Sequence, residues 1–241
     1  MSWRPATVAS VRPESPAART VVLQVPGWPG HQAGQHVDLR LTADDGYTAS
    51  RSYSIASVAD GELVEVTVER LDDGEVSPYL VDVVAPGDRV EVRGPVGGWF
   101  VWKPEQAEPV LLVGGGSGVV PLMSIVRRHV DCGSAAPLRL VYSLRDPDAM
   151  LYRDELAALA ADGLPVTYVY TRRTPEGWPR PAGRLDAALL AASAFPPSES
   201  PTSYVCGPTG FVETVADLLV GAGHDPRRVR TERFGPSGGS S

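Results

Sequence analysis

The chain has 241 residues, of which 43% are hydrophobic and 21% charged, proportions typical of an ordinary globular protein. This length fits two domains of about 100–130 residues each. The formal net charge of −7 argues against a nucleic-acid backbone as a partner, because the phosphates would repel the chain.

Cysteine content and apolar segments narrow the class further. Cys132 and Cys206 are the only cysteines, too few for a four-cysteine iron–sulfur cluster or zinc site. The four histidines show no metal-ligand spacing, so no metal site is predicted. No apolar stretch approaches the ~18–20 residues of a membrane span, and the first ten residues lack the apolar core of a signal peptide. We therefore expect a cytoplasmic protein with reduced thiols.

The N-terminal part of the chain predicts β-structure. Short β-rich runs, bounded by glycine, proline and aspartate, predict an antiparallel, six-stranded closed barrel. We expect this domain to span residues 1–103. One helix is expected over residues 77–84, with Ser77 as its N-cap and Pro78 at its first helical position. The six runs are residues 6–11 (the weakest), 20–25, 36–41, 51–56, 63–71 and 89–94.

Beyond a boundary near residues 103–108, apolar strands alternate with amphipathic helices. This alternation predicts an α/β domain with a parallel sheet over residues 109–235. Residues 236–241, rich in glycine and serine, are expected to be a flexible tail. The predicted strands are 109–115, 138–143, 165–171, 203–207 and 228–234, and the helices are 118–130, 148–162, 184–193 and 209–223.

The run SRSYSIAS, residues 50–57, alternates as a strand does but has no plain apolar face. Arg51 and Tyr53 share one face, and Ser50, Ser52 and Ser54 share the other. A half-buried strand normally pairs an apolar face with a wet one. The pattern therefore raises the question of what this strand contacts.

The segment LLVGGGSGVVPLM, residues 111–123, follows an apolar strand and opens a helix. Such a turn lets peptide N–H groups and a helix N-terminus approach a phosphate pair. Val119 stands where the dinucleotide fingerprint has its third glycine, so a plain tight turn remains an alternative. A P-loop is excluded because Lys103, the only lysine, precedes Pro104, and Val119 also excludes a nucleophile elbow.

The second strand of the α/β domain ends with Ser143 and Arg145, where NAD-binding folds often carry a carboxylate for the ribose hydroxyls. A hydroxyl and a guanidinium suit a 2′-phosphate better. Arg172, at the end of the third strand, adds positive charge. The alternative is that both arginines are merely solvated loop charges.

Together, Arg51-Ser52-Tyr53-Ser54 in a barrel and the glycine-rich turn in a following α/β domain resemble the ferredoxin–NADP⁺ reductase superfamily of flavoenzymes. The resemblance covers nearly the whole chain. It extends to GEVS (74–77), GDRVEVRGPVGGWF (87–100), YSLRDPDAMLYRDEL (142–156), YVCGPTGF (204–211) and TERFG (231–235).

For the barrel, the resemblance implies an FAD site. Arg51 is expected to pair with the flavin pyrophosphate, Tyr53 to lie against the isoalloxazine, and Ser54 to hydrogen-bond near flavin N5. Residues 74–77 contribute helix amides and a hydroxyl to the pyrophosphate, and the backbone of residues 66–70 bonds the flavin ring. The full set implied for FAD is Arg51, Ser52, Tyr53, Ser54, Val66, Val68, Arg70, Gly74, Val76, Ser77 and Phe234.

For the α/β domain, the resemblance implies an NAD(P)H site, with NADPH slightly preferred over NADH. A basic residue of related NADPH enzymes is replaced here by Met150. Cys206 lies in the turn expected near the nicotinamide, and Glu232 resembles an acidic residue near the active site. With Ser54 these two form the expected catalytic set. The residues implied for the nucleotide are Gly115, Gly116, Ser117, Gly118, Val119, Ser143, Arg145, Tyr152, Arg172, Cys206, Gly207 and Pro208.

The resemblance implies an oxidoreductase that moves hydride from NAD(P)H to FAD and passes electrons on. We expect the acceptor to be a separate redox protein, ferredoxin-like or another partner, because two cysteines rule out a fused iron–sulfur domain. Two alternatives stay open: direct reduction of a small molecule such as a flavin, quinone or ferric chelate, and a flavin- or nucleotide-binding subunit without turnover.

Overall fold

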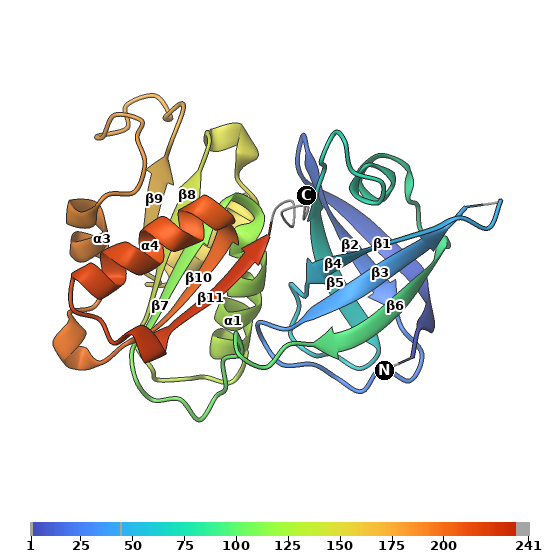
Figure 1. Ribbon diagram of the computed structural model, residues 1–241, viewed down its shortest axis with the longest axis horizontal. Coiled ribbons are helices and arrows are strands. Elements are labelled where there is room, and N and C mark those ends of the chain that lie inside the picture. Colours follow the sequence, from blue (N-terminus) through green and yellow to red (C-terminus); the bar gives the residue numbers. More distant parts are fainter. Residues whose placement is uncertain (1, 44, 235–241) are drawn as a thin grey trace, which may run out of the picture. The chain divides into compact units, whose positions relative to one another are not determined.

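The computed structural model describes residues 2–43 and 45–234, and the predicted tail lies outside the described residues (Figure 1). The chain divides into two compact units. The first comprises Met1–Lys103 together with Met123–Cys132, and the second comprises Pro104–Leu122 together with Gly133–Ser241. Among the described residues, none of the helices has both the length and the apolar character needed to cross a bilayer.

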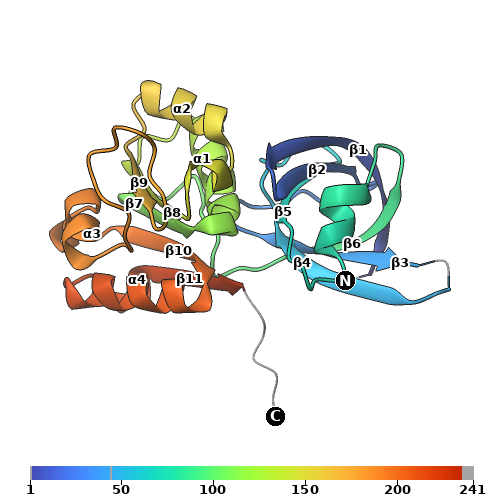
Figure 2. The ribbon, with the colours of Figure 1, turned by 90° about the horizontal axis from the view of Figure 1, so that it is seen from above.

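The first unit contains a six-stranded antiparallel sheet, as the sequence predicts. Its strands follow the order β4-β3-β6-β1-β2-β5. Along β5, Val64, Val66 and Val68 point into the core, while Glu65 and Glu69 are partly exposed and Thr67 is buried on the other face. The strands wrap around this core (Figure 2). Their bounds are β1 Arg4–Ser15, β2 Ala18–Gln24, β3 His36–Thr42, β4 Thr48–Ser54, β5 Leu63–Glu69 and β6 Arg89–Val96.

The predicted closed barrel is joined only sparsely between its two edge strands. Ile55 and Val66 form an isolated bridge, and the Ala56 N–H donates to the Glu65 carbonyl at 2.8 Å. No longer ladder joins β4 to β5 within residues 2–43 and 45–234. The β4–β5 seam, defined here as the edges of residues 51–54 and 67–70, therefore opens beyond the bridge.

The predicted N-cap of the helix over residues 77–84 is wrong. The helical segment contains a π-helical turn, η1 (Tyr79–Val83), with Pro78 at its N-cap position and no side-chain cap. The buried Ser77 hydroxyl instead accepts a hydrogen bond from the Leu71 N–H at 3.1 Å. This bond closes the preceding turn, so the serine stabilises the turn and leaves the helix end uncapped.

The second unit contains a five-stranded parallel sheet in the order β11-β10-β7-β8-β9, again as predicted. Helices cover both faces, with α2 on one side and α3 and α4 on the other (Figure 2). The strands are β7 Val110–Gly115, β8 Leu138–Leu144, β9 Val166–Tyr170, β10 Thr202–Pro208 and β11 Val229–Phe234. The helices are α2 Arg153–Ala161, α3 Ala187–Ser193 and α4 Thr209–Gly221, and α1 Val119–Asp131 begins in this unit and ends in the first.

The helix predicted over residues 148–162 begins later than expected. Asp146 accepts bonds from the Asp148 and Ala149 N–H groups and caps a short 3-10 turn, Pro147–Ala149. Tyr152 then adopts a left-handed conformation, with φ of 55°, before α2 begins at Arg153. A non-glycine residue in this region interrupts a helix, so two short elements replace one long one.

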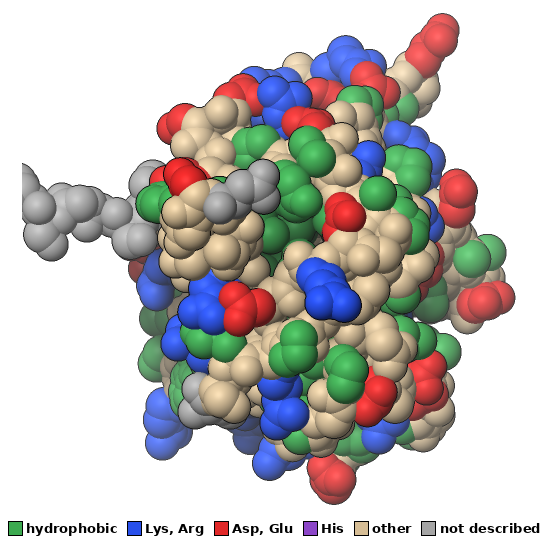
Figure 3. Space-filling view, turned by 90° about the vertical axis from the view of Figure 1, so that its right-hand side faces the viewer, with side chains coloured by type: hydrophobic (Ala, Val, Ile, Leu, Met, Phe, Trp, Pro, Cys, Tyr) green, Lys and Arg blue, Asp and Glu red, His purple; other side chains and the backbone are tan. Residues whose placement is uncertain are grey.

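Charges of both signs lie on one face of the first unit. On the face shown in Figure 3, acidic and basic side chains are interspersed, with hydrophobic side chains between them. This mixed surface shows no large field of one sign.

Candidate functional site

In the first unit, the side chains of β4 divide between its two faces as the alternation requires. Tyr53 is half-buried and packs against the barrel core, and burial raises the pKa of its hydroxyl above its ordinary value. Arg51 shares its face but is exposed. Ser52 lies on the other face, where its hydroxyl donates to Asp38 at 2.6 Å. Ser54, half-buried, ends the strand opposite His36.

Strand alternation decides which backbone groups of β5 face the seam. The Glu65 N–H and C=O face β4, where they bond Ser57 and Ala56. By strand alternation, the peptide groups of Thr67 and Glu69 face the same side. By the same alternation the peptide groups of Val66 and Val68 face β2, and the Arg70 N–H donates to the Ala17 carbonyl at 2.8 Å. Strand alternation thus favours the backbones of Thr67 and Glu69 over those of Val66, Val68 and Arg70 as the groups on the seam side.

The Arg70 side chain is engaged by carboxylates. Its guanidinium lies 3.3 Å from Asp72 and 3.4 Å from Asp82. The side chains of Val66 and Val68 are fully buried in the core. The predicted segment, residues 66–70, spans both sets of backbones, and the two-residue alternation decides which of them face the seam.

The turn from Gly74 to Ser77 is tightly packed. A Cβ at Gly74 would lie 2.8 Å from the Ser77 hydroxyl and 3.1 Å from the Leu71 carbonyl, so a side chain does not fit without a shift. Val76 is buried and its carbonyl accepts from the Leu80 N–H. The turn therefore holds its backbone, including that of Glu75, in a fixed place.

Glu75 was not predicted as a site residue from the sequence, yet it contacts Arg51, the arginine expected to bind the pyrophosphate. Its carboxylate accepts from Arg51 at 2.8 Å and from the Tyr47 hydroxyl at 2.7 Å. The Tyr47 bond and then the Arg51 bond hold the pKa of Glu75 below its ordinary value. No spacing rule indicates this pair, because β4 and the 74–77 turn come together only in the fold.

In the second unit, the glycine-rich turn brings two strand ends close together. Gly115 ends β7, Gly116 has a φ of +56°, and a short 3-10 turn leads to the buried Val119. A Cβ at Gly118 would lie 2.2 Å from the Cys206 carbonyl oxygen. Only glycine permits this approach. Ser117 is half-exposed at the centre of the turn.

Phe211, which sequence reasoning missed, explains two more of the predicted glycines. A Cβ at Gly115 would lie 2.7 Å from its ring, and one at Gly207 would lie 2.8 Å from it. The ring thus packs under both turns at the carboxyl ends of β7 and β10. Pro208 follows as an exposed residue at the N-cap of α4.

At the ends of β8 and β9, two arginines have no acidic partner among the residues that the structure describes. Ser143 is buried beside Gly115, while Arg145 and Arg172 are exposed. The Arg145 carbonyl accepts from the Arg172 N–H at 2.9 Å, which ties the two loops together. Neither guanidinium forms an ion pair with a carboxylate in the described part of the chain. The two charges are therefore available to an anion.

The neighbouring Arg173 differs because it pairs with Asp148 and lies 3.6 Å from Asp146. Tyr152 and Met150 are buried, with exposed fractions of 3% and 6%. The predicted contact of Tyr152 with a 2′-phosphate therefore has less support than those of Arg145 and Arg172.

Cys206 and Glu232 lie side by side on β10 and β11. Cys206 is fully buried, and burial raises the pKa of its thiol well above its ordinary value. Burial also raises the pKa of Glu232 to about 7. Both groups thus favour their protonated forms. Phe234 pairs with Pro208 at the end of the same strands and is 37% exposed.

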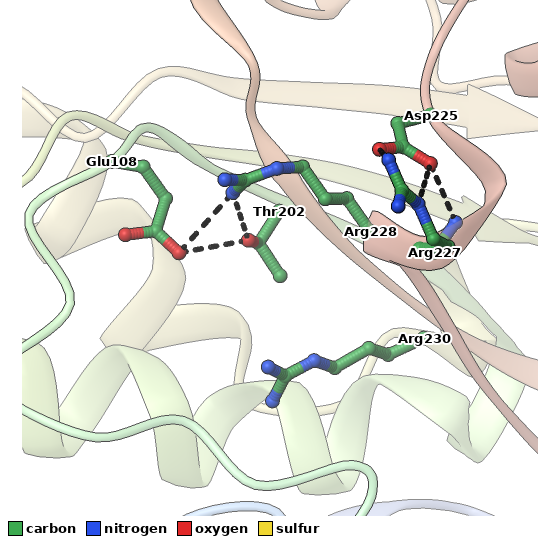
Figure 4. A pocket seen from close by; sticks show the side chains of 6 residues that line it. All are labelled: Glu108, Thr202, Asp225, Arg227, Arg228 and Arg230. Atoms are coloured by element: carbon green, nitrogen blue, oxygen red, sulfur yellow. Dashed lines mark hydrogen bonds and ion pairs between the residues drawn. The ribbon is translucent and has the colours of Figure 1, made fainter.

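A polar pocket lies at the opposite, amino-terminal ends of β10 and β11 (Figure 4). Arg228 approaches Glu108 at 3.5 Å, and Arg227 pairs with Asp225 at 2.9 Å. The Arg230 guanidinium donates to the Tyr204 hydroxyl at 3.2 Å. These contacts hold the lining charges against one another, as in a structural ion-pair cluster.

Comparison with known families accounts for both units. Residues 6–101 match the oxidoreductase FAD-binding domain, and residues 112–217 match the oxidoreductase NAD-binding domain. A ferredoxin–NADP reductase B from Sorangium cellulosum is 33% identical over 241 residues, covering 95% of this chain and 96% of that protein.

Other relatives are longer. The ferredoxin reductase component of a 3-ketosteroid-9-alpha-monooxygenase from Rhodococcus rhodochrous is 33% identical over 234 residues. A glycine betaine monooxygenase reductase subunit from Pseudomonas aeruginosa is 33% identical over 208 residues. The matches cover 95% and 85% of this chain but only 64% and 56% of those proteins.

Solved structures show the same architecture. The FAD/NAD-binding domain of a nitric oxide dioxygenase from Vibrio cholerae superposes with a TM-score of 0.86 at 26% identity. The match covers 97% of this chain and 99% of that one. The similarity extends across both units.

Proposed function

The chain belongs to the ferredoxin–NADP⁺ reductase family of FAD- and NAD(P)H-dependent oxidoreductases, and from this we propose that it passes electrons to a separate acceptor protein. Relatives in Rhodococcus rhodochrous and Pseudomonas aeruginosa are reductase components of monooxygenases. The proposed acceptor is accordingly a redox protein or oxygenase component.

The residues of the first unit fit FAD. The observation that carries this is the open β4–β5 seam, with strand edges on both sides and Arg51 on its rim. The carboxylate already bound to Arg51 supports an anion at that position. FAD supplies the chemistry, accepting two electrons from the nicotinamide as a hydride and releasing them singly.

The side chains have positioning roles in this proposal. Arg51 neutralises the pyrophosphate, Tyr53 lies against the isoalloxazine, and Ser54 hydrogen-bonds near N5. The Gly74–Ser77 turn supports the phosphates with its backbone. The peptide groups of Thr67 and Glu69 bond the ring edge in place of those predicted at first.

The second unit is proposed to bind NADPH in preference to NADH. The glycine-rich turn allows a pyrophosphate to approach the backbone at the start of α1. Arg145 and Arg172 supply charge for a 2′-phosphate, with Ser143 beside them. Cys206 and Glu232, both protonated at slightly acidic pH, present neutral groups at the carboxyl ends of β10 and β11.

The purified protein tests this function. We expect it to be yellow, and we expect NADPH to bleach the flavin band within seconds. A protein that stays colourless after incubation with FAD would contradict the FAD site. A yellow protein that neither nicotinamide bleaches would be a binding subunit without turnover.

The acceptor needs a separate measurement. Steady-state rates with free flavin, a quinone and a ferric chelate are compared with the rate for redox proteins captured from the native host. We expect the protein acceptor to give the highest kcat/KM. A small molecule that is reduced faster would support direct reduction instead.

A further inference from the structure

The guanidinium proposed to bind the FAD pyrophosphate already holds an anion from its own chain. Arg51 donates to the Glu75 carboxylate at 2.8 Å and to the Ser50 carbonyl at 2.8 Å. Glu75 also accepts from the Tyr47 hydroxyl at 2.7 Å. Two donors from β4 and the loop before it thus converge on one carboxylate.

Glu75 lies in the turn that is proposed to carry the phosphates. Gly74 and Ser77 fix this turn through the Leu71 backbone, so the Glu75 backbone has little freedom. A pyrophosphate that binds both Arg51 and this turn must enter the region that the Glu75 carboxylate now occupies. The two anions therefore compete for the same guanidinium, and they also repel each other.

We propose that Glu75 is an internal substitute for the pyrophosphate, which holds Arg51 in the cofactor-free protein and is displaced when FAD binds. The inference rests on the FAD site described above. Its consequence is that Glu75 weakens FAD binding and sets the cofactor affinity. Only the fraction of molecules in which Arg51 is released is ready to bind, and the apparent Kd rises accordingly.

Tyr47 makes the substitute more stable. Tyr47 is 58% exposed, so the position of its hydroxyl depends on few packing contacts. By donating to the second carboxylate oxygen, it keeps Glu75 oriented toward Arg51. Removing this hydroxyl should loosen the pair without changing its charge.

The size of the effect follows from exposure. The side chains of Arg51 and Glu75 are 53% and 47% exposed, and ion pairs at such positions are weakened by water. We therefore expect Glu75→Gln to lower the Kd for FAD by about two- to fivefold. Tyr47→Phe should lower it less, and Arg51→Ala should raise it by roughly tenfold or more.

The matched control is Glu91→Gln. Glu91 also pairs with an arginine, Arg40, at 2.6 Å and 2.7 Å, but it lies on β6 away from the seam. The two substitutions remove the same charge. A gain in affinity in both variants would reduce the effect to net charge and overturn the proposal.

FAD titrations of the apoprotein, followed by flavin fluorescence, measure these affinities. Stopped-flow mixing should show a faster association rate for Glu75→Gln, because fewer molecules must first release Arg51. Riboflavin, which lacks phosphate, serves as a second probe, and its affinity should not change. Weaker FAD binding by Glu75→Gln would mean that Glu75 positions Arg51 or binds FAD directly, which overturns the proposal.

A double variant separates competition from repulsion. In an Arg51→Ala background, Glu75→Gln should gain clearly less affinity than in the wild type, because no guanidinium remains to compete for. An equal gain in both backgrounds overturns the proposal. If even the wild type binds no FAD, the proposed FAD site itself is wrong. If the wild type binds FAD and Glu75→Gln binds it with the same affinity, the FAD site stands and the proposed role of Glu75 is overturned.

Discussion

At the scale of single residues, Arg145 and Arg172, which pair with no carboxylate in residues 2–43 and 45–234, carry the proposed choice of nicotinamide. Arg145→Ala removes one guanidinium from the end of β8 while leaving the carbonyl that ties the Arg172 loop. We expect the KM for NADPH to rise by roughly ten- to a hundredfold, because a hydrogen bond to a charged group is lost.

NADH serves as the internal control for this prediction. It lacks the 2′-phosphate, so its KM should change by less than about twofold. An equal loss for both nucleotides would show that Arg145 supports the fold of the loop instead of reading the phosphate. If Arg145→Ala has the same KM values for both nucleotides as the wild type, Arg145 is only a solvated charge.

Glu232 gives a pH-dependent prediction. Its pKa is raised to about 7 in the folded protein from 4.5 in the unfolded chain, so the folded state binds the proton more tightly. The free energy of unfolding should therefore be unaffected by this group below pH 4.5 and should fall as the pH rises toward 7. The loss is at most about 3 kcal/mol.

Urea unfolding of wild type and Glu232→Gln at several pH values tests this. The amide cannot titrate, so the difference in stability between the two proteins should change in favour of the variant between pH 4.5 and 7. A difference that stays constant over this range would contradict a raised pKa. Above pH 7.5 the stability difference should level off, because Glu232 is then ionised in both the folded and the unfolded protein.

At the scale of elements, the tight approach of the glycine-rich turn to β10 is the feature most sensitive to one added carbon. Gly118→Ala would place a Cβ 2.2 Å from the Cys206 carbonyl oxygen, which is backbone and cannot rotate away. We expect a loss of about 1–3 kcal/mol or more in stability and weaker NADP⁺ binding, measured by thermal unfolding and nucleotide titration.

Gly210→Ala is the control for this prediction. Gly210 lies in the first turn of α4, and a Cβ there meets nothing within 4 Å. Alanine is the better helix former, so this variant should be unchanged or more stable by about 0.5–1 kcal/mol. If the two variants lose the same stability, the close approach at Gly118 is not the cause.

The elements also show what the sequence could predict. Strands and most helices follow from local periodicity, so both sheets and the βα order were predicted correctly from residues such as Val64, Val66 and Val68. The Ser77 cap and the start of α2 were wrong because each depends on one local choice, a turn bond to Leu71 and the left-handed Tyr152. Local patterns do not distinguish such competing bonds.

The candidate site likewise has features that local sequence patterns indicate and features that only the fold creates. The glycine-rich turn and the arginine-tyrosine-serine run could be read directly, because each is contiguous. Glu75 on Arg51 and Phe211 under Gly115 could not, because the partners come from segments that meet only in the folded chain. Which backbones line the seam depends on the pairing of β5 with β2, which no single-strand pattern specifies.

At the scale of the whole molecule, helix α1 breaks the simple division into an N-terminal and a C-terminal domain. It begins after the glycine-rich turn, yet residues 123–132 belong to the first compact unit. Within that unit, Arg127 donates to the Ala56 carbonyl at 2.8 Å and approaches Glu65 at 3.3 Å. These contacts flank the bridge that closes one end of the β4–β5 seam.

Arg127→Ala should therefore destabilise the barrel, although residue 127 lies beyond the predicted boundary. Its side chain is only 16% exposed, and the variant leaves the Ala56 carbonyl without this donor, at a cost of about 1–3 kcal/mol. Arg128→Ala is the matched control, since Arg128 is 40% exposed and pairs within its own helix with Asp131. That variant should change stability by less than about 0.5 kcal/mol.

Hydrogen exchange locates the effect within the chain, because β5 amides should exchange faster in Arg127→Ala and β8 amides should not. Equal exchange in both variants would show that the end of α1 does not support the barrel.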